Sequence, residues 1–320
     1  KAVKYFKKSY DKGNLSGYAR YGSSLIEGDG GLQKDIEKGL QLIKYSFDRN
    51  NIDAIYLYSY YLSVGLSNLE KNEKLALKYS KIAANMGNCD AISNTGFYYY
   101  TGIGTDIDRN ESYKYFLKGF EEGSIVSARN LGFLLIGVDS KYENAALKYW
   151  KFASDNGDIT SMYNYSKTIA TKKSTFKELE EMEYCLKKGV YLKDDDLISL
   201  YADILCRNDI LPQDKVKAAR YYKMSGELGN SFSLSKYALC LLEGFGVEAN
   251  YDVALKYFKI SADCGCLQSM VKYASLLSKK EEGTFDKNEV IKYYKMAIEK
   301  GETSTEVDLT EAKRYIEMTK

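Results

Sequence analysis

Three Gly-x-Gly turns are the residues of this sequence that most resemble a site for chemistry. They are Gly28 and Gly30, Gly102 and Gly104, and Gly244 and Gly246. A glycine-rich loop binds phosphate when it follows a strand and opens a helix, because the backbone amides and the helix dipole then point at the anion. Here each turn follows a predicted helix, recurs at repeat spacing and lacks the Gly-Lys-Ser/Thr ending. We therefore interpret the turns as tight connections between helices.

Histidine and cysteine are the other residue types that would indicate nucleophilic catalysis or metal binding. The chain has no histidine, which removes the commonest general base, the Ser–His and Cys–His nucleophile pairs and most zinc sites. Its cysteines are Cys89, Cys185, Cys206, Cys240, Cys264 and Cys266. A single residue separates Cys264 from Cys266, which strains an intramolecular disulfide, and no further ligands lie nearby in the sequence. We interpret these cysteines as reduced structural thiols.

Acidic residues cluster at three places where acid–base chemistry could be considered. These are Glu121–Glu122, Asp194 to Asp196 and Glu281–Glu282. They lie near predicted turns, where carboxylates favour helix starts and solvation. No pattern brings two of them together, so we predict no catalytic residue, no cofactor and no metal ligand.

Composition indicates a folded, nearly neutral chain. Lys plus Arg number 46 and Asp plus Glu 44, a formal charge of +2. This balance gives no global field for nucleic acid or an anionic membrane, and no stretch approaches 18 consecutive apolar residues. We therefore expect no nucleic-acid partner, no direct membrane insertion, and a cytoplasmic location with the endoplasmic-reticulum lumen as the alternative. Because the chain starts at Lys1 without a methionine, we expect a piece of a longer protein.

The sequence repeats itself at intervals of 34 to 37 residues. One column, mostly tyrosine, contains Tyr5, Leu42, Tyr79, Tyr115, Tyr149, Cys185, Tyr221, Tyr257 and Tyr293. Four residues later comes a first small column: Ser9, Ser46, Ala83, Gly119, Ala153, Gly189, Ser225, Ser261 and Ala297. Between these segments lies a second small column: Gly22, Ser59, Gly96, Gly132, Ser166, Ala202, Ala238 and Ala274. A large apolar residue follows each member of the second small column by three positions.

These offsets predict pairs of amphipathic helices. Positions three and four apart share one helix face, and a small residue beside a large one lets a neighbouring helix approach closely. Each repeat is therefore a helix A and a helix B joined by a short turn, and hairpins must stack to bury their apolar faces. We interpret most of the 31 tyrosines as core, with the remainder facing a groove; base stacking is the alternative.

Glycine is expected to end helix B in the left-handed conformation, which glycine enters without steric cost. The predicted caps are Gly13, Gly87, Gly123, Gly157, Gly229, Gly265 and Gly301. Asn50 takes this position in the second repeat. Lys193 breaks the pattern, and we expect a looser turn there.

The pattern A-x-x-x-L-G-x-x-Y-x-x-G-x-G-V, then K-A-x-x-W/Y and A-x-x-G, resembles Sel1-like repeats, relatives of the tetratricopeptide repeats. It is clearest at residues 91–123 and 237–265. The resemblance implies an all-α, right-handed α-solenoid superhelix of about eight helix-turn-helix repeats over residues 1–302, beginning with an orphan helix B at 1–12. Residues 303–320 should form a terminal helix, around 307–318, that covers the exposed end. Repeats five and six depart from the pattern at 170–178 and 207–214, where we expect loops of different shape.

The resemblance also implies a function. A stacked array offers a long concave surface, and similar families bind peptides or partner domains there. We expect a non-catalytic protein–protein interaction scaffold or adaptor with a protein or peptide partner and an unspecified oligomeric state. The alternatives are a regulatory or substrate-recruiting region of a larger protein, such as a kinase fusion or an endoplasmic-reticulum degradation adaptor, and a hydrolase.

Candidate groove residues follow from the register of tetratricopeptide grooves. They should lie six and three residues before the second small column, and one and four after it. These residues are Asp53, Tyr56, Tyr60, Asp90, Ser93, Phe97, Tyr100, Arg129, Phe133, Tyr163, Lys167, Asp196, Ser199 and Asp203.

Overall fold

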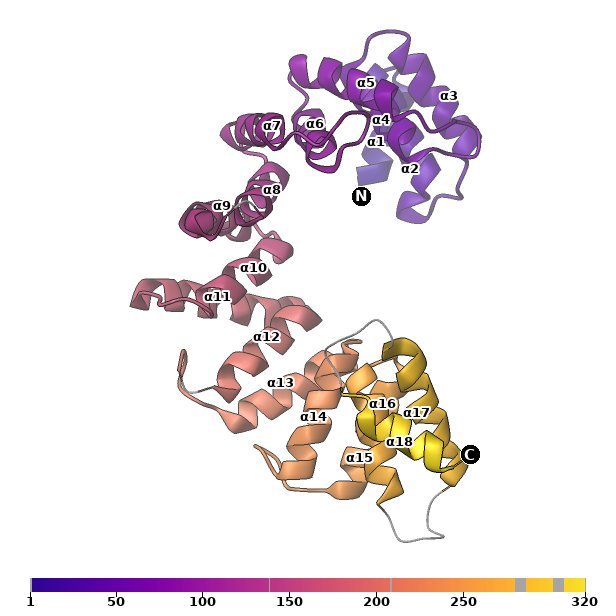
Figure 1. Cartoon of the computed structure of the whole chain (residues 1–320). Helices are drawn as coiled ribbons and strands as arrows, with labels where there is room; N and C mark the ends of the chain where they lie inside the picture. Colours follow the sequence, from indigo (N-terminus) through magenta and orange to yellow (C-terminus); the bar gives the residue numbers. More distant parts are fainter. Residues whose placement is uncertain (1, 138, 208, 280–285, 302–307, 320) are drawn as a thin grey trace. The chain divides into compact units, whose positions relative to one another are not determined.

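The computed structural model (Figure 1) describes residues 2–137, 139–207, 209–279, 286–301 and 308–319. These residues form eighteen α-helices and two short 3-10 helices. The helices group into two compact units, unit 1 (Lys1–Asp158) and unit 2 (Ile159–Lys320). The predicted all-α repeat solenoid is confirmed.

Unit 1 holds an initial helix and four hairpins. Its helices are α1 (Ala2–Asp11), α2 (Leu15–Glu27), α3 (Ile36–Phe47), α4 (Ile52–Val64), α5 (Glu73–Asn85), α6 (Cys89–Thr101), α7 (Arg109–Glu121), α8 (Ile125–Ile136) and α9 (Glu143–Asp155). The 3-10 helices η1 (Asp29–Gly31) and η2 (Ser140–Tyr142) lie in turns. Even-numbered helices are the A helices of the repeats, and α1 packs on α2 as a helix B would.

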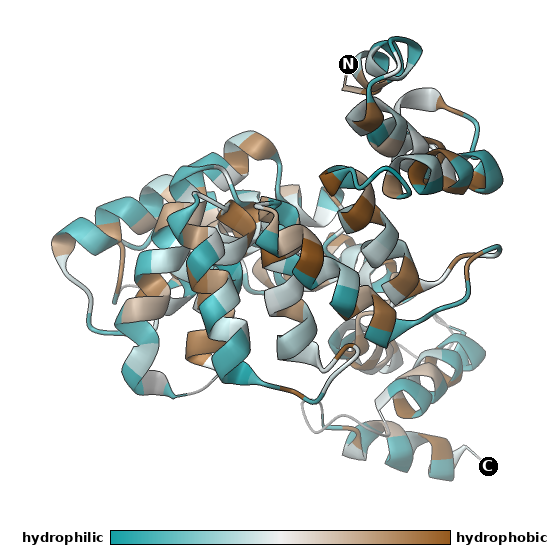
Figure 2. Ribbon diagram, turned by 90° about the horizontal axis from the view of Figure 1, so that it is seen from above, coloured by the Kyte–Doolittle hydropathy of each residue, from teal (hydrophilic) through white to brown (hydrophobic). Residues whose placement is uncertain are grey.

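Unit 2 holds four more hairpins and a terminal helix. Its helices are α10 (Ile159–Ile169), α11 (Phe176–Leu192), α12 (Asp195–Cys206), α13 (Lys215–Glu227), α14 (Ser231–Glu243), α15 (Tyr251–Asp263), α16 (Leu267–Ser278), α17 (Lys287–Gly301) and α18 (Thr310–Met318). Figure 2 shows hydrophobic and hydrophilic residues alternating along the helices of both units, as expected for helices that bury one face.

Helix A and helix B of one repeat cross at the second small column, every member of which is buried. A Cβ atom added at Gly96 would lie 2.7 Å from the ring of Phe116, and one added at Gly132 would collide with the indole of Trp150. Where the column has serine, the hydroxyl can bond across the crossing: Ser59 Oγ donates to the Ala76 carbonyl at 2.8 Å. The small residue therefore determines how closely the two helices pack.

Helix B packs on the next helix A at the first small column. In unit 2, Ser225 Oγ donates to Ser233 Oγ at 2.8 Å, and Ser269 Oγ donates to Ser261 Oγ at 2.7 Å. The partners lie eight residues later, in the first turn of the following helix A. They form a column that our sequence analysis missed: Gly17, Ala54, Ala91, Ser127, Ser161, Leu197, Ser233 and Ser269.

The ends of the B helices correct two predictions. Lys193 adopts the left-handed conformation (φ 58°, ψ 40°), and the Asp194 N–H donates to the Gly189 carbonyl at 3.0 Å. The N–H of Asp158 makes the same bond to Ala153 after a glycine cap, so the expected looser turn at Lys193 is wrong. Gly301 is wrong as a left-handed cap, because it is the buried last residue of α17.

The Gly-x-Gly turns connect helix A to helix B, as predicted. Gly28, Gly102 and Gly244 end their A helices with φ of 77°, 80° and 70°. The second glycine has a different role: Gly104 and Gly246 lie against the backbone carbonyls of Glu73 and Lys215, the first residues of the preceding B helices. A side chain at either glycine would push neighbouring repeats apart.

The loops of repeats five and six differ from these turns to different degrees. In repeat five, Thr175 and Glu178 form a capping box that starts α11, and Ser174 Oγ donates to the Ile169 carbonyl at 2.9 Å. In repeat six, the Asp214 N–H still donates to the Leu205 carbonyl at 3.1 Å. Repeat seven makes the same bond from Asn250 to Leu241. Although the loop sequence of repeat six differs, the hydrogen bond that ties the start of helix B to helix A is retained.

Helix α18 docks at the end of unit 2. Ala312 is buried, and the Glu311 carboxylate accepts hydrogen bonds from Ser275 Oγ at 2.8 Å and from Tyr294 Oη at 3.1 Å. The rings of Tyr294 and Tyr315 lie 5.3 Å apart. The predicted terminal helix is present from Thr310 to Met318. Asp308 and Leu309 precede it, and Val307 lies outside the described residues.

The left-handed Lys193 provides a test of the cap geometry. Lys193→Gly should raise the free energy of unfolding by roughly 0.5–1 kcal/mol, because a side chain is strained at this φ. Gly157→Ala should lower it by about 1 kcal/mol, because a Cβ at Gly157 meets no atom within 4 Å and only the φ of 95° opposes it. Midpoints of urea unfolding followed by circular dichroism measure both changes. A lower midpoint for Lys193→Gly would contradict the assigned conformation.

The crossing of α8 and α9 provides a second test. Gly132→Ala should lower the free energy of unfolding by about 1–3 kcal/mol, because the added methyl overlaps the Trp150 indole. The matched control is Gly137→Ala at the exposed end of α8, where φ is −71° and alanine is readily accommodated. Equal unfolding midpoints for the two variants would show that the helices do not approach closely at Gly132.

Candidate protein-interaction surface

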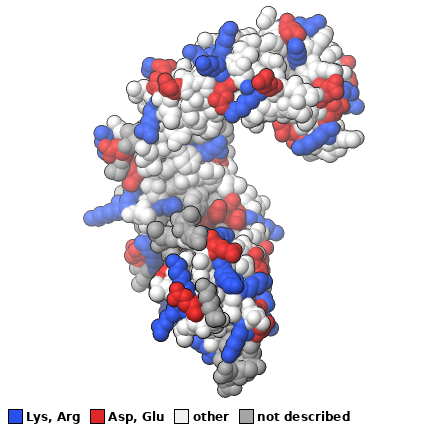
Figure 3. All heavy atoms as spheres, turned by 45° about the vertical axis from the view of Figure 1, so that its right-hand side comes forward, with Lys and Arg blue, Asp and Glu red and all other residues white. Residues whose placement is uncertain are grey.

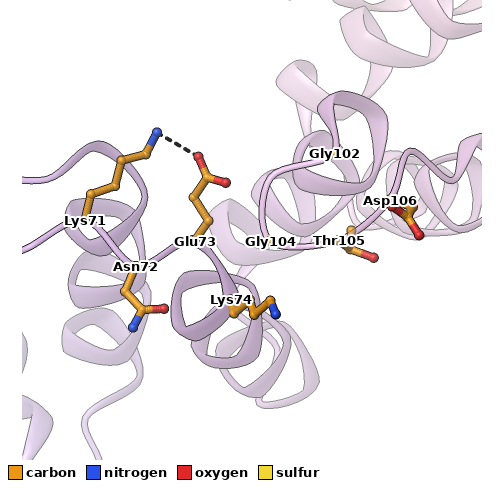
Figure 4. Close-up of a pocket in the computed structure, with 8 residues that line it drawn as sticks. All are labelled: Lys71, Asn72, Glu73, Lys74, Gly102, Gly104, Thr105 and Asp106. Carbon is orange, nitrogen blue, oxygen red and sulfur yellow. Dashed lines mark ion pairs between the residues drawn. The ribbon is translucent and has the colours of Figure 1, made fainter.

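The Gly-x-Gly turn of α6 borders an open hollow of about 780 Å³, shown in Figure 4. Lys71 Nζ lies 2.7 Å from Glu73 Oε1, and this hydrogen bond lowers the pKa of the Glu73 carboxyl. Asn72 caps α5 by accepting from the Leu75 N–H at 3.0 Å. Lys71 and the Asn72 cap already have protein partners, and the glycines end a helix where a phosphate loop would follow a strand. The geometry therefore favours a structural turn over a phosphate loop.

Other reactive groups are dispersed. Within the described residues, no group of three or more Cys, Asp or Glu side chains is arranged to hold a metal ion. All six cysteines are thiols, with Cys264 exposed and Cys266 buried. Burial raises the pKa of Cys240 to about 12, which keeps this thiol protonated. The described helices include none that is long and apolar enough to cross a membrane.

A strip of apolar side chains is exposed on the A helices of unit 1. The exposed fractions are 38% for Tyr60, 52% for Val64, 42% for Phe97, 38% for Tyr100 and 38% for Ile136. Phe133 is half-buried beside them in the repeat register. We call these six residues, on α4, α6 and α8, the A face. A group of exposed large apolar side chains is typical of an interaction site.

A pocket of about 210 Å³ opens on the A face. Its lining residues are Phe97, Tyr100, Phe116, Asn130 and Phe133. The Phe133 ring is held edge-on against Trp150 at a centroid distance of 5.5 Å. The volume is below the range of roughly 300–1,000 Å³ for small-molecule sites, so the pocket suits a single side chain of a partner better than a whole ligand.

Charged side chains lie in the N-terminal halves of α2, α4, α6 and α8. Arg20 Nη2 lies 2.7 Å from Asp53 Oδ1 and 3.9 Å from Asp90 Oδ2. Arg129 Nη1 lies 2.9 Å from Asp158 Oδ1. Over the face drawn in Figure 3, positive and negative side chains are interspersed without a large field of one sign. Both arginines therefore have carboxylate partners within unit 1.

Eight of the predicted groove residues are less exposed than expected, and six of these are half-buried: Asp53, Tyr56, Arg129, Phe133, Tyr163 and Asp203. Ser93 and Ser199 are buried, so the prediction that they are exposed is wrong: Ser93 Oγ lies 2.7 Å from Ser127 Oγ, and Ser199 Oγ accepts from Ser233 Oγ at 2.8 Å. Tyr56 is half-buried, and burial raises its pKa. Tyr56, Ser93 and Ser199 each lie three residues before the second small column. Neighbouring A helices approach so closely there that these side chains face the adjacent helix.

The predicted residues of unit 2 do not form an apolar strip. Lys167 is exposed, with its ammonium 5.7 Å from the Tyr163 ring centroid. Asp196 accepts from Asn230 Nδ2 at 3.2 Å, and partial burial raises its pKa. Asp203 accepts from Tyr222 Oη at 2.6 Å. These side chains are polar or already bonded within unit 2.

Four contributors to the A face and its pocket were missed from the sequence, among them Phe116 of α7, which lines the pocket from a helix B. Ile136 occupies the same register as Tyr100, four residues after the second small column, so the repeat pattern could have found it. Val64 lies one residue beyond that register. Asn130 lies two residues before the column, a position that we had not assigned to the surface.

Comparison with known proteins places the chain in a family. The sequence model of the Sel1 repeat matches residues 1–14, 15–51, 52–88, 89–124, 126–158, 204–230, 231–266 and 291–318. Residues 159–203, which include all of repeat five, are unmatched, in line with its different loop. A search of curated proteins finds no match.

Two solved structures are similar in fold. One is c5321, a protective antigen of uropathogenic Escherichia coli, with TM-score 0.73 and 20% identity over 93% of this chain and 64% of that chain. The other is a Sel1 repeat protein of Oxalobacter formigenes, with TM-score 0.73 and 16% identity over 99% of this chain and 90% of that one. This chain therefore spans less than two thirds of the E. coli protein. Since the family model matches most of its residues, the chain belongs to the Sel1 repeat family.

Proposed function

We propose that this chain is a non-catalytic interaction scaffold that binds a peptide segment of a partner protein on the A face. The observation that carries this proposal is the exposed apolar strip together with its side-chain-sized pocket. Stacked helical repeats characteristically present extended binding surfaces of this kind. The Sel1 repeat assignment supports the same class of function.

The energetics favour a partner at this position. Large aromatic side chains in water gain free energy when a partner covers them, and a single apolar anchor buried in a preformed pocket contributes roughly 1.5–3 kcal/mol. Phe97 and Tyr100 project from one face of α6, and Phe116 and Phe133 complete the pocket wall. Because these rings are held by helices, little side-chain entropy is lost on binding.

A display experiment tests this function. Random twelve-residue peptides would be selected on the immobilised full chain, and the affinity of the enriched peptides measured by fluorescence anisotropy. Phe97→Ala with Tyr100→Ala should weaken binding at least about tenfold, because the partner's anchor loses its pocket walls.

The matched control removes two exposed rings elsewhere, Tyr184 and Tyr191 of α11, which are 61% and 85% exposed. Their double alanine variant should bind within about twofold of the original chain. Circular dichroism should show both variants folded. Undiminished binding by the Phe97/Tyr100 variant would rule out the A face as the peptide site.

A further inference from the structure

The A helices of unit 1 carry few charges, and those charges are unequal in sign. Helices α2, α4, α6 and α8 contain five charged residues: Arg20, Glu27, Asp53, Asp90 and Arg129. Both arginines are held by carboxylates, Arg20 by Asp53 at 2.7 Å and Arg129 by Asp158 at 2.9 Å. Both arginines on these four helices therefore have a close carboxylate. Glu27 and Asp90, by contrast, have no cation among the described residues that is paired with them alone.

Asp90 is the carboxylate best placed to meet a partner. Its side chain is 55% exposed, and its nearest cation, Arg20, is 3.9 Å away and already bonded to Asp53. A ligand cation would therefore find an exposed carboxylate at this end of α6.

The distance from Asp90 to the pocket defines a spacing. Asp90 and Phe97 are seven residues apart on one helix, which corresponds to roughly 10.5 Å along the helix axis at 1.5 Å per residue. An extended peptide rises about 3.3 Å per residue. A side chain in the pocket and a cation at Asp90 would therefore be separated by about three residues of the bound segment.

We infer that the segment bound on the A face carries a large apolar anchor and a lysine or arginine about three residues away, with the basic side chain paired to Asp90. This inference rests on the proposed function and adds the chemistry of the partner. The same charge opposes an acidic segment, because Asp90 would repel a carboxylate placed near it.

The peptide selection on the A face also tests this inference, through the amino-acid sequences of the enriched peptides. Selected peptides should share a Phe, Tyr, Trp, Leu, Ile or Met and an excess of Lys or Arg two to four positions away. For one such peptide, Asp90→Asn should weaken binding about two- to fivefold, the range of an exposed ion pair. Replacing the peptide's basic residue by Gln should have a similar effect, and the two changes together should be no worse than either one alone.

The control is Asp106→Asn, which makes the same charge change at an exposed residue of the Gly-x-Gly turn and should leave affinity unchanged. Equal effects of the two variants, or selected peptides without a basic excess, would overturn the inference and leave the proposed function standing. Selection of acidic peptides would overturn it as well. If no peptide is enriched on the original chain, the proposed function itself fails.

Discussion

The close approach of helices at small side chains is the constraint on which the rest of this structure depends. At the second small column helix A meets its own helix B, and at the first small column helix B meets the next helix A. The large side chains beside these contacts, such as Phe116 and Trp150, then fill the space around glycine. Because these two contacts recur along each unit, neighbouring hairpins of one unit stack in the same way.

The same packing decides which residues remain in water. A helix A is covered by its own helix B and by the preceding helix B, and its neighbours on the A side reach residues three before the second small column, such as Ser93 and Ser199. Some residues one and four after the column stay accessible, whereas Ile26, Ser63, Ala170 and Ser275 at these positions are buried. In unit 1 these positions carry Tyr60, Phe97 and Tyr100, whereas in unit 2 they carry residues such as Lys167 and Asp203. At the residues named, the same repeat positions are therefore aromatic in unit 1 and charged in unit 2.

Much of this architecture was predictable, because the repeat columns report contacts that recur in every hairpin. The Gly-x-Gly turns were predicted as helix connections for the same reason. Lys193 and Gly301 were not, since a residue's type indicates a left-handed preference but the surrounding bonds decide its conformation. At Lys193 the bond from Asp194 to Gly189 holds the lysine at positive φ. Gly301 is still helical, as the last residue of α17, and its missing side chain makes room for Leu309.

The sequence by itself determined the helical class, the A and B segments, the family and the absence of histidine-based chemistry, because these depend on residue type and spacing along one chain. Only the tertiary structure decided which groove candidates are buried, that both arginines on the A helices of unit 1 are already paired, and that Phe97, Tyr100, Phe116 and Phe133 surround one pocket. The physical reason is that exposure and pairing depend on side chains from different helices, and the repeat spacing does not encode how closely those helices approach.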